Sequence, residues 1–172
     1  MGHRALLARE RADGRYDVYY AHWGGADLSL ARRLAGNWAP DEPPDPETDP
    51  AVRDAPLSVG VAFEAVLADH LDPLVHELLV VLGRDAVDAY RPLWFGPVAG
   101  EADTPSALVS VDPRVARDDE RVLAWFRGTR DAVADLVARG AIDGPTASTC
   151  LRRRLRAWGR DREVIHAPGA GD

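Results

Sequence analysis

The chain has 172 residues, of which 46% are hydrophobic and 28% charged, so it fits one domain of a globular protein. No apolar run approaches the roughly 20 residues that a bilayer span needs, and residues 1–10 lack the pattern of a signal peptide; we therefore expect a cytoplasmic protein without a membrane segment. Cys150 is the single cysteine, which excludes an internal disulfide and a thiolate metal cluster.

The charged residues are restricted in kind. All 21 cationic residues are arginines, 20 of the 28 acids are aspartates, and the net charge is -7. An acidic surface without lysine is expected of a protein that works in high salt, where screening weakens the repulsion between carboxylates. A GC-rich genome favours the same residues, and composition alone leaves both explanations open.

Residues 4–10 and 16–23 flank the pair Asp13-Gly14, which predicts a β-hairpin that opens the fold. The second strand carries apolar or aromatic residues on both faces, so we expect it to be covered on both sides and central in its sheet. A short helix follows, with Asp27 as its N-cap and Gly36 at its end.

Residues 40–56 form an acidic, proline-rich segment. Six prolines and six acids fill 12 of its 17 positions, a composition that predicts a solvated loop. Because the parts on either side look too small to fold alone, we expect a single domain over residues 1–172 with this segment as an insertion loop.

The remainder of the chain predicts alternating helices and strands. Residues 74–82 could be either the first strand of a second hairpin or a buried helical segment. The expected elements, in chain order, are a helix at 58–72, the hairpin at 75–96 around Gly83-Arg84-Asp85, a strand at 106–112, helices at 118–139 and 143–160, and a last strand at 162–167. The sum is an α+β fold: a mixed or antiparallel sheet built from two hairpins plus one or two further strands, with packed helices that include a C-terminal helical hairpin.

Five stretches together resemble an uncharacterised family of small haloarchaeal proteins. They are "GHRAL", "YYAHWGG", "FEAVLADHLD", "YRPLWFG" and "WFRGT". The resemblance spans most of the chain outside residues 40–56. It implies a salt-adapted cytoplasm and favours the halophilic explanation of the composition, but it implies no activity.

The stretch "YYAHWGG", residues 19–25, is the first candidate site. A strand that ends in glycines and leads into a helix can hold an anion on backbone amides, with His22 as an acid or base beside Gly24 and Gly25. The spacing matches no phosphate-binding loop. We therefore favour a covered strand end, with Trp23 packed, His22 semi-buried and the glycines allowing the chain to turn.

Two further groups contain histidine or arginine beside aromatic residues. His70 and His76 are six residues apart, so they would diverge on a helix, and the sequence indicates no metal site and no cofactor. In "YRPLWFG", Arg91 and Trp94 could line a pocket that recognises a carboxylate, although core packing explains the aromatic residues equally well.

The C-terminal helix concentrates positive charge. Residues 150–162 carry six arginines against one acid, whereas residues 39–72 carry nine acids against one arginine. Two explanations stay open: a solvated helix face that can pair with the acidic loop of the same chain, or a site for nucleic acid or an acidic protein. The arginines on or beside the polar face are Arg152, Arg153, Arg156 and Arg160.

Two hypotheses for function follow from these patterns, and neither is tied to a known reaction motif. The first is a non-enzymatic binding or regulatory module that uses the charged helix and the aromatic strand end for a macromolecular partner. The alternative is a small enzyme for an anionic metabolite, with His22 as acid or base, the amides of Gly24 and Gly25, and Arg91 holding the substrate.

Overall fold

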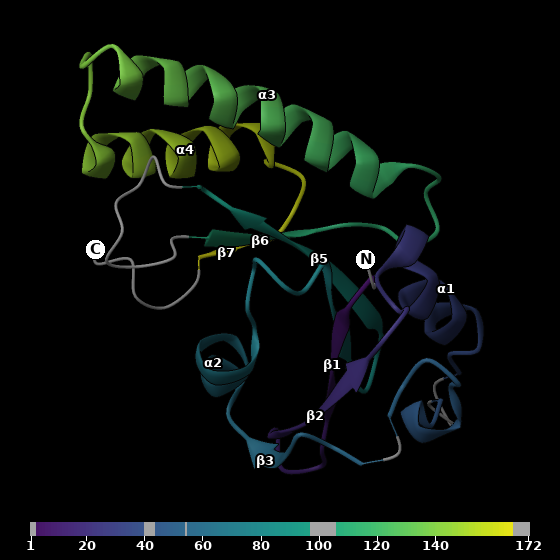
Figure 1. Ribbon diagram of the computed structural model, residues 1–172. Coiled ribbons are helices and arrows are strands. Elements are labelled where there is room, and N and C mark those ends of the chain that lie inside the picture. Colours follow the sequence, from purple (N-terminus) through teal and green to yellow (C-terminus); the bar gives the residue numbers. More distant parts are fainter. Residues whose placement is uncertain (1–2, 40–43, 54, 97–105, 167–172) are drawn as a thin grey trace.

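A seven-stranded mixed sheet forms the centre of the protein (Figure 1). The computed structural model describes residues 3–39, 44–53, 55–96 and 106–166. The elements are β1 (Ala5–Glu10), β2 (Tyr16–Ala21), η1 (Ala26–Leu28), α1 (Ser29–Gly36), η2 (Pro46–Thr48), β3 (Ser58–Val61), α2 (Phe63–Ala65), η3 (Val66–His70), β4 (Leu78–Leu82), β5 (Val87–Trp94), β6 (Ser106–Ser110), α3 (Asp118–Ala138), α4 (Gly144–Trp158) and β7 (Val164–His166). The strand order is β3-β2-β1-β4-β5-β6-β7.

The strand pairing confirms the predicted α+β class and identifies the sheet as mixed. β1 pairs antiparallel with β2 and parallel with β4, and all other neighbours are antiparallel. Residues 78–82 are a strand, which settles the choice left open by the sequence. Alternating residues therefore face two separate cores.

The larger core lies between the sheet and α1, α3 and α4, and the smaller one lies under α2 and η3. In Figure 1 the paired α3 and α4 lie over the half of the sheet that contains β6 and β7. In both helices the sequence places apolar residues at helical spacing, which predicts an inward face, and of these Phe126, Val133, Leu151 and Leu155 join the larger core. Leu136 has the same helical spacing in α3, so the sequence predicts that it faces inward, but it is 43% exposed.

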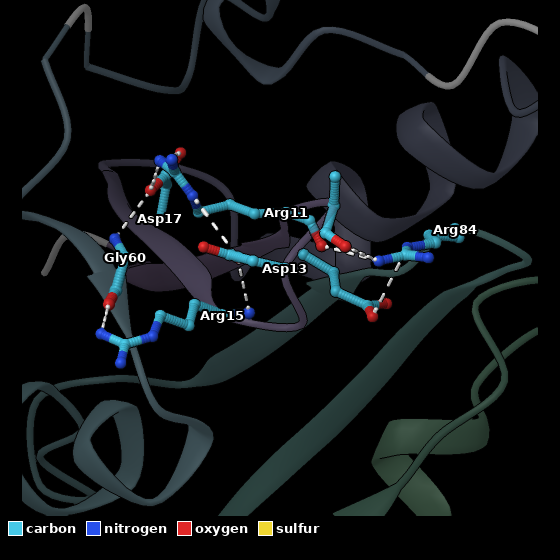
Figure 2. Close-up of polar contacts among 8 residues, drawn as sticks. Arg11, Asp13, Arg15, Asp17, Gly60 and Arg84 are labelled. Carbon is cyan, nitrogen blue, oxygen red and sulfur yellow. Dashed lines mark hydrogen bonds and ion pairs between the residues drawn. The ribbon is translucent and has the colours of Figure 1, made fainter.

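The turn of the first hairpin is held by charged groups. Gly14 has a φ of +76°, which is the conformation that the Asp-Gly pair predicts. Arg11 donates to both carboxylate oxygens of Asp17, and Asp17 accepts from the backbone N–H of Gly60 on β3 (Figure 2). Arg84 donates to the carbonyl oxygen of Ala12 from the next hairpin. These contacts fix β3 and the second hairpin against the first.

Residues 58–72 do not form the single helix that the sequence predicts. Val59 lies on β3 and is 60% exposed, and only the part from Phe63 onward is helical. Gly60, with a φ of +67°, is poorly suited to a helix, and Arg15 donates to its carbonyl oxygen. Pairing with β2 therefore overrides the helical spacing of apolar residues across 58–72, although Val66 and Leu67, which belong to that spacing, are buried.

The acidic segment is more closely packed than its composition predicts. Residues 40–43 and 54 lie outside the described residues. Pro46 and Val52 are buried, and Val52 forms a β-bridge with Ala21. The described acids contact the body of the protein, because Asp49 pairs with Arg33 through two hydrogen bonds of 2.7 and 3.0 Å.

Candidate functional site

Three segments meet at one end of the sheet. β1 and β4 are parallel, so their first residues lie side by side, and the last residues of the antiparallel β2 reach the same end. This topology brings His3, His76 and the end of the "YYAHWGG" stretch together. Sequence reasoning could not place His3 and His76 here, because the parallel pairing of β1 with β4 has no local signal.

A cluster of rings occupies this end of the sheet. Trp23 meets His22 edge to face, with ring centroids 5.0 Å apart and planes at 89°, and its centroid lies 6.2 Å from that of His3. Tyr20 lies 6.2 Å from His22 and 6.4 Å from His76 between ring centroids. We call the following residues the aromatic–histidine surface: His3, Tyr20, His22, Trp23, Arg53 and His76.

Exposure of this surface contradicts the covered strand end that we had predicted. Trp23 is 55% exposed, and His22 is exposed as well. The strand ends at Ala21, so the alternation of faces stops before His22, whose backbone N–H donates to the carbonyl of Ala51. Trp23 then lies in the loop before η1 rather than in a core.

Gly24 and Gly25 serve close packing rather than a turn of unusual conformation. A Cβ atom on Gly24 would lie 2.9 Å from the Cβ of Ala21, and one on Gly25 would lie 3.1 Å from the carbonyl oxygen of Arg4. Gly25 has a φ of -79°, which any residue can adopt, and its N–H donates to the carbonyl of His3. The glycines therefore let the loop pack closely against the end of β2, the start of α1 and the residues that precede β1.

Asp27 does not cap the following helix, contrary to the prediction. It has a φ of +49°, and no side-chain cap bond forms at the start of η1 or α1. Instead the Ser29 hydroxyl donates to the carbonyl oxygen of Trp23 over 3.2 Å. This bond anchors the backbone that carries the exposed indole.

Polar contacts order the other members of the surface. Nδ1 of His3 lies 2.9 Å from Oε2 of Glu77, and Nδ1 of His76 accepts from the backbone N–H of Asp72. Burial lowers the pKa of His76, so it is neutral at pH 7. The Arg53 guanidinium lies over the Tyr20 ring at 4.8 Å, a cation–π contact. Among the described residues, no group of three or more histidine, cysteine, aspartate or glutamate side chains could hold a metal ion.

Arg91 and Trp94 are on β5. Arg91 is half-buried and donates to the carbonyl oxygen of Glu77 over 2.7 Å, and burial lowers the pKa of its guanidinium. Trp94 is half-buried at the last position of β5, opposite Ser106. Arg91 is thus already engaged with the segment that precedes β4.

The predicted basic face of the C-terminal helix is present. Arg153, Arg156 and Arg160 are exposed and Arg152 is half-buried. Nε of Arg156 lies 3.3 Å from Nε2 of His166 on β7, a contact that the sequence did not predict.

A polar cavity of about 470 Å³ lies beyond the other end of the sheet and was not predicted either. An ion pair is part of its lining, in which the half-buried Arg162 donates 2.8 and 2.6 Å hydrogen bonds to the buried Asp118. Arg162 also stacks over Trp158, which stacks in turn on Trp125. Strands, helices and loops far apart in the sequence line this cavity, and no local pattern could indicate it. Other lining residues are Asp88, Ser110, Asp112, Pro113, Arg114 and Asp161.

Comparison with known proteins gives one match. A family model described as a family of unknown function (DUF6735) matches residues 1–49 and 44–166. No curated protein and no solved structure matches the chain. Within the described residues, none of the helices has the length and hydropathy to span a bilayer.

Proposed function

Because the chain belongs to this family of unknown function, we propose from the structure that it is a binding module whose partner protein docks on the aromatic–histidine surface. The observation that carries the proposal is the 55% exposure of Trp23. A large aromatic side chain in water is unfavourable in an isolated protein, and exposed apolar groups of this kind mark interaction sites.

The chemistry of the surface supports a protein partner. Tryptophan, tyrosine and arginine are the residues that most often dominate the binding free energy of protein interfaces, and Trp23, Tyr20 and Arg53 lie in one cluster. Leu74, which is 59% exposed, lies two residues before His76 and adds apolar area. Hydrogen bonds from Ser29 and Gly25 order the backbone, so little entropy is lost when a partner binds.

The alternative enzyme is less well supported by the geometry. It requires free amides at Gly24 and Gly25 and a free guanidinium at Arg91. The Gly25 N–H donates to His3, and Arg91 donates to the carbonyl of Glu77. A Cβ atom on either glycine would also meet neighbouring atoms within 3.1 Å, so both glycines are closely packed on their Cα side.

Three broader statements also belong to the proposal. The chain forms a single domain, because β1 and β2, which precede the acidic segment, lie between β3 and β4, which follow it. It works in the cytoplasm, and that cytoplasm is salt-adapted. The absence of lysine and the net charge of -7 support the salt adaptation.

Photo-cross-linking in the native host tests the docking surface. A cross-linker placed at Leu74 is expected to capture a partner protein, and one at Leu136, an exposed leucine on α3, is the matched control. In a Trp23→Ala background the Leu74 adduct should disappear. An adduct that persists unchanged in that background would refute docking on Trp23.

A further inference from the structure

The polar cavity is built where the start of β5, the end of β6 and the end of α4 meet. Its volume of about 470 Å³ lies within the range of small-molecule sites, about 300 to 1,000 Å³. β5 supplies Val87 to Ala89, the chain from the end of β6 supplies residues 110–115, and α4 supplies Trp158. The aromatic–histidine surface shares none of these lining residues, so a ligand in the cavity is independent of docking on that surface.

Aspartates outnumber arginines in the lining of the cavity. The described lining residues include four aspartates and two arginines, and each arginine is paired with an aspartate of the same lining. Arg162 lies 2.6 Å from Asp118, and Arg114 lies 3.7 Å from Asp112. The two other aspartates therefore give this lining a net charge of -2. They are Asp88 and Asp161.

The surroundings of Asp88 favour a cation. Partial burial raises the pKa of Asp88, and the negative charge of Glu163 raises it further. Glu163 is held in place because it accepts a 2.6 Å hydrogen bond from the Tyr90 hydroxyl. A cation beside Asp88 relieves the repulsion between these carboxylates, whereas an anion adds to it. Because a concave wall of one charge sign concentrates the counter-ion, the cavity should collect positively charged ligands.

The helix ends at the cavity agree with this preference. α4 ends at Trp158, and the last carbonyl groups of a helix carry a partial negative charge. α3 begins at Asp118, and this carboxylate offsets the partial positive charge of the helix N-terminus. The two helix ends together therefore do not oppose a bound cation.

We propose that the cavity binds a small aliphatic amine that carries two or more ammonium groups. Asp88 on β5 and Asp161 after α4 supply carboxylates from two different parts of the lining, so two ammonium groups can be matched at once. Val115, which is 42% exposed, and Val87 line the same cavity. Methylene chains pack on apolar side chains of this kind while their charged ends stay in polar surroundings.

Isothermal titration calorimetry with the diamine putrescine tests this proposal. Titrations are made at about 0.1 M KCl, because higher salt screens the attraction between ammonium and carboxylate groups. The wild-type protein should bind putrescine at one site and bind methylammonium, which has one charge and no chain, about tenfold or more weakly. The double variant Asp88→Asn/Asp161→Asn should lose about tenfold or more in affinity for putrescine.

The control variant Asp131→Asn/Asp135→Asn removes the same charge from α3, where both side chains are exposed. Its affinity for putrescine should stay within about twofold of the wild type, and circular dichroism checks that both double variants are folded. Equal losses in the two double variants, or no binding by the wild type, would overturn the proposal. Tighter binding of Mg²⁺ than of putrescine would overturn it in favour of a metal site. Tighter binding of N-acetyl-lysine amide would overturn it in favour of a lysine side chain from a partner protein.

Discussion

The indole of Trp23 stands edge-on to the imidazole of His22, with ring centroids 5.0 Å apart and planes at 89°. Both side chains are exposed, and neither belongs to the two hydrophobic cores. Their contact orders a surface rather than an interior.

Replacing Trp23 by Ala should cost less than about 1 kcal/mol of the free energy of unfolding, because the indole is already in contact with water. Phe95→Ala is the matched control, since Phe95 is fully buried against Phe126 and its loss should cost about 3 to 5 kcal/mol. Urea denaturation of both variants measures the difference. Similar losses in the two would mean that Trp23 belongs to the core.

Gly24→Ala should destabilise the protein by about 1 to 3 kcal/mol, because its Cβ would lie 2.9 Å from the Cβ of Ala21. Gly128 lies at an exposed position in the middle of α3, and no atom lies near a Cβ added there. Gly128→Ala should therefore raise the free energy of unfolding by up to about 1 kcal/mol. Thermal melts of the two variants check the opposite signs. A harmless Gly24→Ala would show that the loop does not need its close approach to the sheet.

Features of the fold that depend on local sequence could be predicted, whereas features that depend on contacts between distant segments could not. Asp13-Gly14 fixed the first hairpin, and the spacing of Val122, Phe126 and Val133 fixed α3, because both signals are local. The exposure of Trp23 could not be predicted, since it depends on the strand ending two residues earlier. His3 and His76 join the site only through strand pairing across more than 70 residues.

Arg162→Ala should cost about 3 kcal/mol, because it leaves the 4%-exposed Asp118 without its main partner. Arg117→Ala breaks an exposed pair with Glu120 and should cost less than about 1 kcal/mol. Guanidinium denaturation near pH 7 measures both. A small effect of Arg162→Ala would show that water can replace the guanidinium beside Asp118 without loss of stability.

The same pair should make stability depend on pH. The hydrogen bonds from Arg162 lower the pKa of the Asp118 carboxyl in the folded state. Its contribution to stability is therefore complete above the unfolded pKa of about 4 and is lost as the pH falls through the lower folded value. In Asp118→Asn this part of the acid destabilisation should be absent.

Salt should raise the melting temperature of the wild-type protein between about 0.1 M and 2 M KCl, because screening relieves the repulsion of a chain with net charge -7. Differential scanning calorimetry measures the trend. A flat or falling melting temperature would favour genome composition over salt adaptation as the reason for the missing lysine.

Hydroxyl-radical footprinting tests the central claim most directly, by comparing oxidation of Trp23 in living host cells with that in the purified protein. The peptide between Arg15 and Arg32 reports Trp23, and Leu136 on α3 serves as the exposed reference side chain. A docked partner should protect Trp23 in cells severalfold relative to Leu136. Equal oxidation of Trp23 in both settings would contradict a binding function for the aromatic–histidine surface.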